Sequence, residues 1–129
     1  MDTPPPTCHG AQASVHQFPV AHNDDAPSYQ WSVNTSAFMR ADMRGRGLGK
    51  ALYRALHGRL AELGYVQAFA GVALPNAASV ALHESVGYRH LGTYEKVGFK
   101  LGQWRDVAWF QKALRAPVDT PLPPEAPSA

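Results

Sequence analysis

The sequence predicts an α/β fold in which two helices pack on a mixed β-sheet. Apolar and polar side chains alternate over residues 29–39, which is typical of a half-buried strand. A Gly-rich turn follows, and leucines then recur at spacings of three and four over residues 48–63, as on one face of a helix. A strand that leads through a helix to a further strand makes a right-handed crossover, which predicts a parallel strand pair.

The first strand and helix are defined by their apolar positions and by a glycine. The strand carries Trp31 and Val33 on one face and extends it more weakly through Thr35, Ala37 and Met39. The helix presents one apolar face, made of Leu48, Leu52, Leu56, Leu60 and Leu63. Gly64 follows the last of these leucines, at the position where a left-handed residue ends a helix.

The remaining elements continue the alternation. Residues 65–73 are predicted as a second strand. Pro75 and Asn76 open a second helix, because an asparagine side chain can accept a hydrogen bond from a free backbone N–H of the first turn. This helix ends near Val86, with Gly87 as its cap. Residues 88–98 and 104–113 are predicted as two further strands joined by a Gly-rich connection, which gives a C-terminal antiparallel pair.

Composition divides the 129-residue chain into one basic domain and two tails. Ten of the eleven prolines lie before residue 28 or after residue 114, and ten of the eleven glycines lie between residues 45 and 102. Residues 28–114 hold eleven basic and five acidic side chains, a net charge of +6. We therefore expect one domain over 28–114, a disordered Pro-rich segment over 1–27 and a disordered Pro-rich tail over 115–129.

Several classes of protein are excluded or disfavoured at this stage. Cys8 is the single cysteine, which excludes an internal disulfide and any cysteine-based zinc site, and no metal is expected. No apolar run approaches the ~18 residues that a membrane span needs, so no membrane partner is expected. No basic stretch followed by an apolar segment opens the chain, so no secretory signal is expected. The location predicted is the cytoplasm.

The Gly-rich turn is the first candidate site. It consists of Arg44, Gly45, Arg46, Gly47, Leu48, Gly49 and Lys50, between a strand and a helix. Such a turn directs backbone N–H groups and a helix N-terminus to one point, which suits a phosphate; the alternative is an ordinary loop with solvated arginines. Arg44 and Ala51 exclude a nucleoside-triphosphate loop, and neither glycine frame completes a dinucleotide fingerprint.

The remaining pattern, Arg-x-x-Gly-x-Gly, resembles the coenzyme A loop of the GCN5-related N-acetyltransferases. Residues 74–88, Leu-Pro-Asn-Ala-Ala-Ser-Val-Ala-Leu-His-Glu-Ser-Val-Gly-Tyr, resemble the second motif of that family. Residues 92–107 are similar to the phosphinothricin and methionine-sulfone acetyltransferases within it. The resemblance covers residues 28–113 and implies the C-terminal part of that fold, a mixed sheet with a parallel pair of strands that splay apart.

The resemblance implies a site for acetyl-CoA as cosubstrate. The pantetheine arm would pair with the backbone of Ala37, Phe38 and Met39, and the pyrophosphate would lie over residues 44–50. Asn76 and Ser79 would contact the cofactor near its thioester end. His83 would protonate the departing thiolate or help to move the amine proton, because the pKa of imidazole lies near neutrality. His57 and His90 are predicted to be surface residues.

Two departures from the family pattern affect the chemistry. Asn34 occupies the position of the expected general base, a glutamate, and an amide cannot accept a proton at neutral pH. Only 27 residues precede the domain at 28–114 and its first strand at 29–39, where the family has three strands and two helices. We expect this strand to expose an unpaired edge, in a marginal domain that dimerises, binds a partner strand or aggregates.

The function predicted is acetyl transfer to the α-amine of a small amino acid or analogue. The alternative is a non-catalytic remnant or pseudoenzyme that at most binds coenzyme A or a protein partner. A nucleic-acid binder using the basic segment is disfavoured, because no aromatic side chains are interleaved with its basic cluster. A homodimer is implied by the family alone.

Overall fold

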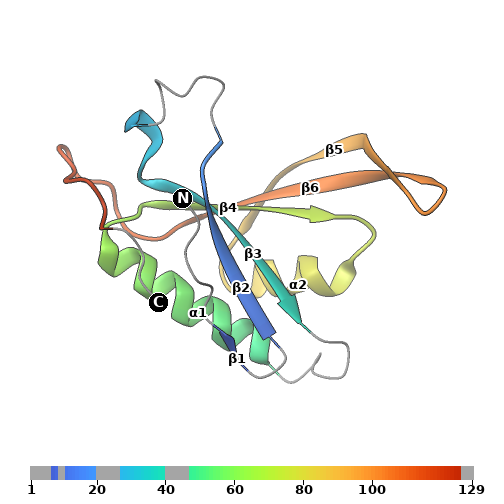
Figure 1. Cartoon of the computed structure of the whole chain (residues 1–129), viewed down its shortest axis with the longest axis horizontal. Coiled ribbons are helices and arrows are strands. Elements are labelled where there is room, and N and C mark those ends of the chain that lie inside the picture. The colour runs from blue at the N-terminus through green and yellow to red at the C-terminus, as the bar shows by residue number, and fades with distance from the viewer. Residues whose placement is uncertain (1–6, 9–10, 20–26, 40–46, 126–129) are drawn as a thin grey trace.

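The computed structural model describes residues 7–8, 11–19, 27–39 and 47–125, which form a six-stranded sheet and two helices. The strands run in the order β1-β2-β3-β4-β6-β5 (Figure 1). Their bounds are β1 Thr7–Cys8, β2 Ala11–Gln17, β3 Ser32–Met39, β4 Gln67–Ala73, β5 Arg89–Lys100 and β6 Gln103–Ala113. The pair β3–β4 is parallel and the other neighbours are antiparallel, so the predicted mixed sheet is confirmed.

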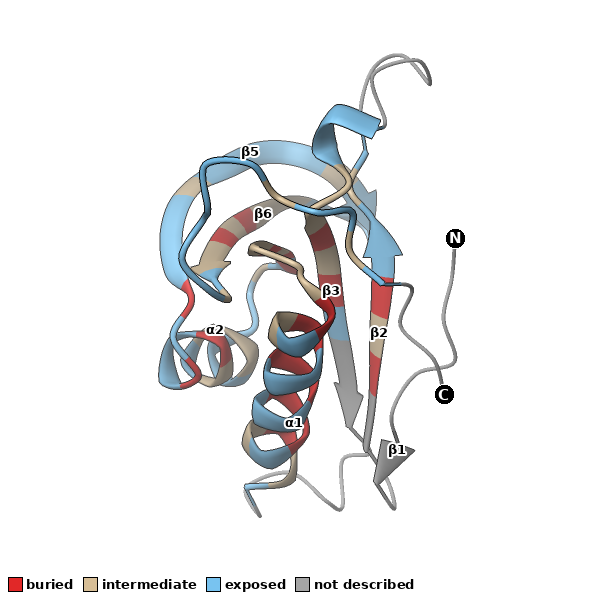
Figure 2. Cartoon of the chain, turned by 90° about the vertical axis from the view of Figure 1, so that its left-hand side faces the viewer, coloured by how far each residue is buried: buried red, intermediate tan, exposed pale blue. Residues whose placement is uncertain are grey.

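Helix α1 spans Leu48–Leu63, as its leucine spacing predicts. Its buried stripe faces the sheet, and its outer face is exposed (Figure 2). Gly64 ends the helix with a φ of 103°, and its N–H donates back to the carbonyl groups of the last turn. A left-handed backbone of this kind strains any residue with a β-carbon, which is why glycine stands there.

Helix α2 spans Ala77–Ser85 and is capped as predicted. The side-chain oxygen of Asn76 accepts a hydrogen bond from the backbone N–H of Ser79 at 3.0 Å. Gly87 follows the helix with a φ of 102°, after Val86 as the cap residue. Both helices lie on the same side of the sheet (Figure 2).

Strand β2 corrects the expectation that residues 1–27 contribute no element and that the next strand has an unpaired edge. Residues 11–17 pair with β3 in antiparallel register over their whole length, from Ala11 opposite Met39 to Gln17 opposite Val33. Ala13 and Val15 of this strand are buried in the core. The edge of β3 is therefore covered by the chain itself, and β1 adds a two-residue pairing beyond β2.

The parallel pair separates after a short stretch. Register pairs between β3 and β4 run from Ser32 opposite Gln67 to Asn34 opposite Phe69. Beyond that point β3 pairs with β2 and β4 pairs with β6, so residues 35–39 and 70–73 face each other across the separation without pairing. We call these two segments the β3–β4 fork (Figure 1). The splayed parallel pair that the sequence resemblance implies is thus present.

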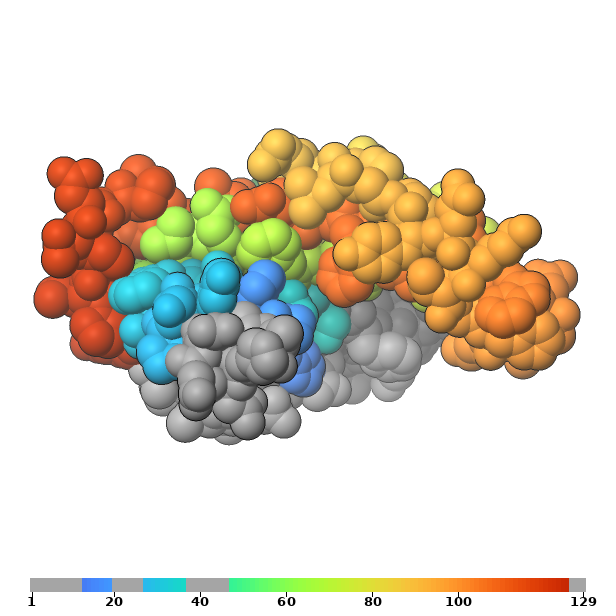
Figure 3. Space-filling model, turned by 90° about the horizontal axis from the view of Figure 1, so that it is seen from above, coloured from blue at the N-terminus to red at the C-terminus, as the bar shows by residue number. Residues whose placement is uncertain are grey.

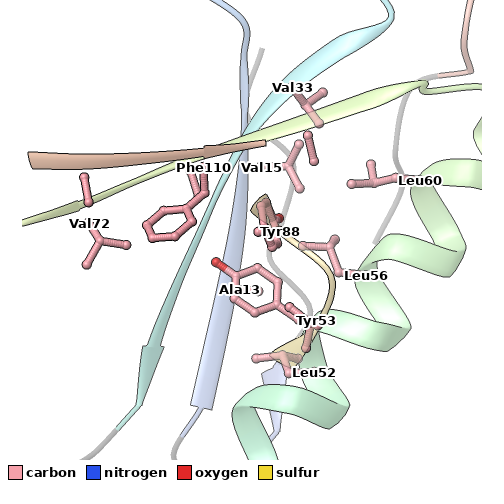
Figure 4. Close-up of a cluster of buried hydrophobic side chains, with 14 residues drawn as sticks. Ala13, Val15, Val33, Leu52, Tyr53, Leu56, Leu60, Val72, Tyr88 and Phe110 are labelled. Carbon is pink, nitrogen blue, oxygen red and sulfur yellow. The ribbon is translucent and has the colours of Figure 1, made fainter. Parts of the chain in front are cut away.

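The core lies between the sheet and the two helices. Tyr53, Leu60 and Phe110 are its largest fully buried side chains. Figure 4 shows Tyr53, Leu56 and Leu60 directed from α1 toward side chains of the sheet. Ala68 and Ala70 of β4 are small residues that are also buried in this core.

Strands β5 and β6 form a long hairpin that projects at one end of the molecule (Figure 3). Its turn is at Leu101 and Gly102, both with positive φ. Exposed apolar side chains gather toward this end, among them Phe99, Leu101 and Trp104. Phe99 and Trp104 pack edge to face, with ring centroids 5.3 Å apart.

The C-terminal segment packs against the domain as far as Glu125, which corrects the expectation of a disordered tail for residues 115–125. The guanidinium of Arg115 donates to the carbonyl of Ala61 at 3.1 Å. The indole N–H of Trp31 donates to the carbonyl of Leu122 at 2.8 Å, and the N–H of Glu125 donates to the carbonyl of Leu63 at 2.8 Å.

The burial of one face of β2 predicts how substitutions in this strand change the free energy of unfolding. We expect Val15→Asp to lower the free energy of unfolding by about 3–5 kcal/mol, because it places an uncompensated carboxylate in the core. The same change at Gln17, which is exposed in the same strand, should cost about 0.5 kcal/mol or less. Urea unfolding followed by circular dichroism measures both; equal stability of the two variants would contradict the docking of β2.

Candidate functional site

The predicted cofactor-binding residues that the structure describes lie at the end of β3 or at the starts of α1 and α2. The chain runs from the end of β3 into α1 and from the end of β4 into α2, so both helix N-termini lie at that end of the fork (Figure 1). Ala37, Phe38 and Met39 form the last part of β3, and their register partners on β2 are Ala13, Gln12 and Ala11. Ligands of open α/β sheets bind at this end of parallel strands.

The Gly-rich turn is described from Gly47 onward, and Arg44, Gly45 and Arg46 lie outside the described residues. Gly47 is the N-cap of α1, with a φ of 74° that favours glycine. It offers no capping side chain, and no acidic residue stands in the first turn. Leu48, Gly49 and Lys50 begin the helix, so its first N–H groups and the Lys50 ammonium form a positive end suited to an anion.

Asn76 and Ser79 begin α2. The carbonyl oxygen of the Asn76 side chain accepts the capping hydrogen bond of α2, so Asn76 has a structural role in this helix. The Ser79 hydroxyl lies 3.4 Å from Nδ1 of His83, one helical turn away. Both residues therefore lie at the N-terminal end of α2, which follows the β4 arm of the fork.

His83 is buried beneath the sheet rather than exposed on a helix face. Its Nδ1 lies 2.7 Å from the carbonyl oxygen of Ser79, which can only accept, so Nδ1 carries the proton. Nε2 then accepts from the hydroxyl of Tyr53 at 2.9 Å. Burial lowers the pKa of His83, although the bond to Ser79 opposes that shift, so the ring is neutral at pH 7.

Tyr53 connects His83 to a larger buried network below the fork. The Tyr53 hydroxyl also hydrogen-bonds Thr35, and burial raises its pKa to about 12. The hydroxyl of Thr35 lies 2.6 Å from that of Tyr88 and donates to the carbonyl of Phe69 at 3.4 Å. Because Phe69 and Thr35 mark the base of the fork, the network joins the two strands where their backbone pairing ends.

His57 completes the network, and the expectation of a surface position is wrong for it. It is 6% exposed, stacks on Tyr53 with ring centroids 5.2 Å apart, and shares a hydrogen bond of 2.9 Å between its Nε2 and the Tyr88 hydroxyl. Burial first, then the positive charge of Lys112, lower the pKa of His57 to about 4. His90 is exposed as predicted, 3.1 Å from the Thr93 hydroxyl.

The burial of two members of this network could have been predicted from the sequence. Tyr53 and His57 are four residues apart and each follows a leucine of the buried stripe, Leu52 and Leu56. A stripe wide enough to cover a sheet includes both positions. Tyr88 and Thr35 join the network through the packing of separate elements, which helical spacing alone does not predict.

Asn34 lies on the opposite face of the sheet from His83. Val33 and Thr35 of β3 are buried on the helix side, so alternation places the half-buried Asn34 on the other face. The two residues predicted to be catalytic therefore flank the base of the fork from opposite sides, and they are not neighbours.

Aromatic side chains line the face that carries Asn34. Phe69 of β4 packs on Phe18, with centroids 5.1 Å apart, and Trp109 of β6 packs on Tyr94, with centroids 5.7 Å apart. The Trp109 ring covers Gly71, where an added β-carbon would come within 3.0 Å of it. The Trp109 indole N–H is buried and has no acceptor among the described residues. Neither helix lies on this face (Figure 2).

The described residues contain no group of three or more histidine, cysteine, aspartate or glutamate side chains that could hold a metal ion. Within the part of the chain that the structure describes, neither helix is long and apolar enough to cross a membrane.

Comparison with known proteins relates this geometry to one family. Residues 15–109 match the family described as the acetyltransferase (GNAT) domain. A phosphinothricin N-acetyltransferase of Streptomyces coelicolor is 44% identical over 88 residues, which are 68% of this chain and 52% of that protein. An L-methionine sulfoximine/L-methionine sulfone acetyltransferase of Pseudomonas aeruginosa is 36% identical over 86 residues, 67% of this chain and 50% of that protein.

Solved structures agree with this relationship. The phosphinothricin acetyltransferase of Sinorhizobium meliloti, determined in complex with AcCoA, superposes with a TM-score of 0.75 at 30% identity. The match covers 88% of this chain and 61% of that one. This chain spans about half the length of the curated relatives it matches.

The buried histidines predict a pH dependence of stability. In the unfolded chain they titrate near their ordinary pKa of 6.5, whereas His57 titrates near 4 in the folded protein. Below pH 6.5 the unfolded state binds more protons, so the free energy of unfolding should fall as the pH drops from 6.5 toward 4, by up to about 1.4 kcal/mol per pH unit for His57, and the lowered pKa of His83 acts in the same direction.

Denaturant unfolding at several pH values measures this slope. We expect His57→Leu to flatten it, since one of the two histidines with a lowered pKa is then absent. His90→Leu, an exposed change, serves as the control and should keep the slope. Equal loss of stability in His57→Leu and in the parent chain between pH 6.5 and 4 would contradict a role of His57 in this pH dependence.

Proposed function

Because this chain belongs to the GNAT acetyltransferase family, we propose that it transfers an acetyl group from acetyl-CoA to the α-amine of a small amino acid or analogue. The acceptors named for its relatives, phosphinothricin and methionine sulfone, define the substrate class. The observation that carries the proposal is the β3–β4 fork, which leaves two strand segments unpaired with each other beside an uncapped helix N-terminus.

The fork suits the elongated cofactor for a physical reason. Backbone groups of residues 35–39 that face away from β2 need a partner other than β4, and an amide-containing pantetheine arm can supply one. We assign that contact to Ala37, Phe38 and Met39. The pyrophosphate then lies over residues 44–50, where the start of α1 and Lys50 stabilise negative charge.

The thioester end of the cofactor is assigned to the start of α2. We assign Asn76 and Ser79 to contacts with it, and His83 to protonation of the departing thiolate. For this, Nε2 of His83 must exchange its bond to Tyr53 for one to sulfur and gain a proton. A negative sulfur nearby favours the protonated ring and opposes the effect of burial on the pKa.

Two further properties complete the proposal. The reaction takes place in the cytoplasm, where acetyl-CoA is available. The protein acts as a homodimer, and the exposed apolar side chains of the β5–β6 hairpin support this arrangement because isolated monomers rarely expose such groups together.

Cofactor binding and turnover test the proposal together. We expect acetyl-CoA to raise the melting temperature of the chain in a saturable way, because a ligand that binds only the folded state stabilises it. Mass spectrometry should detect the N-acetyl product of phosphinothricin or methionine sulfone. Binding without product would leave a coenzyme A-binding protein, and neither binding nor product would contradict the proposal.

Lys50 provides a variant for the same titration. Lys50→Ala removes the positive charge from the first turn of α1, and we expect the Kd for acetyl-CoA to rise roughly three- to tenfold, about 0.7–1.4 kcal/mol. Lys100→Ala on the hairpin is the matched control and should leave the Kd unchanged. An unchanged Kd for Lys50→Ala would show that the phosphates bind elsewhere.

A further inference from the structure

The position expected for the general base is occupied by Asn34, so the proton of the substrate ammonium needs another acceptor. A proton acceptor must lie on the face of the sheet where an amine can approach the fork. The helix face is filled by α1, α2 and their buried side chains (Figure 4). The amine therefore approaches from the face that carries Asn34, which neither helix covers (Figure 2).

The neighbours of Asn34 on that face follow from the strand register. Asn34 pairs with Phe69 of β4 on one side and with His16 of β2 on the other. Side chains of directly paired residues project on the same face, with β-carbons about 4.5–5.5 Å apart. His16 is thus the titratable side chain among the register partners of Asn34, and it is exposed.

The alternation of β2 confirms this orientation. Ala13 and Val15 are buried against α1, so His16 projects away from the helices, as Asn34 does. The imidazole therefore lies beside the space into which a longer carboxylate side chain at position 34 would extend. Its ring has two nitrogens, so one can bond a neighbour while the other accepts a proton.

We propose that His16 is the general base of the acetyl transfer and supplies from β2 the function that Asn34 cannot. A neutral ring nitrogen of His16 takes one proton from the substrate ammonium. The freed nitrogen lone pair forms the C–N bond to the acetyl carbon, and the C–S bond breaks with its electron pair on sulfur. The new amide loses its second proton, the thiolate gains one, and His16 returns its proton to solvent.

This inference rests on the proposed acetyl transfer, and it identifies the chemistry that makes such a transfer feasible without a carboxylate. An imidazole suits the step because one ring nitrogen can accept a proton and later release it. It also explains why residues 11–17 matter to the site: β2 covers the edge of β3 and places a base beside it.

The test compares His16→Gln, Asn34→Glu and the double variant with the parent chain. Acetyl-CoA binding is measured by melting temperature and turnover by mass spectrometry of the product. We expect His16→Gln to bind acetyl-CoA within about twofold of the parent while kcat falls about 100-fold, the size of a lost general base. Asn34→Glu in that background should restore kcat at least tenfold, because its carboxylate enters the same space.

His90→Gln is the matched control, since this exposed histidine lies on β5 and bonds Thr93, and its kcat should not change. Full activity of His16→Gln would overturn the role of His16 and leave the proposed transfer intact. If the parent chain is inactive and Asn34→Glu alone creates turnover, His16 does not act as a base. If no variant forms product, the proposed transfer fails and the role of His16 falls with it.

Discussion

The structure depends on how β3 divides its backbone hydrogen bonds between two neighbours. It pairs with β2 along residues 33–39 but with β4 at only three register positions. The long antiparallel pairing holds β3 in place, which lets β4 diverge and follow β6 instead. The fork is therefore a property of the whole sheet, because removing either outer partner would free one of its arms.

The base of the fork is held by buried polar side chains rather than by further backbone pairing. Thr35 reaches from β3 to the Phe69 carbonyl of β4, and its hydroxyl meets that of Tyr88. Buried hydroxyl and imidazole groups are costly unless each has a partner; the Tyr53 hydroxyl bonds His83, and the Tyr88 hydroxyl bonds His57. The cost of this arrangement is that both histidines resist protonation, which ties the stability of the fork to pH.

The local sequence pattern correctly predicted the elements that are specified by residues within a single segment of the chain. The leucines of α1, the cap at Asn76 and the glycines at 64 and 87 each act on their own neighbours, and the structure agrees with them. The sequence pattern did not predict strand β2, because only Ala13 and Val15 mark its buried face and its register partners on β3 are 16 to 28 residues away. The prediction of a surface position for His57 is wrong because it assumed that a polar residue on a helix face is exposed to solvent.

The same difference between local and non-local signals applies to the candidate site. The family resemblance implied the splayed strand pair, which the structure contains, whereas the roles assigned to the start of α1 and to His83 stay predictions. The resemblance could not pair His16 with Asn34, since that contact exists only once β2 has docked in its register. The sequence pattern thus did not predict the non-local pairing of β2 with β3, which matters both for the fold and for the candidate site.

Hydrogen exchange of backbone amides tests the central claim, that the β3–β4 fork is where the cofactor binds. Mass spectrometry of the full chain, with and without saturating acetyl-CoA, follows exchange in peptides that cover each strand. The account predicts slower exchange in residues 35–39 of β3 and at the start of α1, with little change in the β5–β6 hairpin. Unchanged exchange in β3, with protection elsewhere or nowhere, would contradict it.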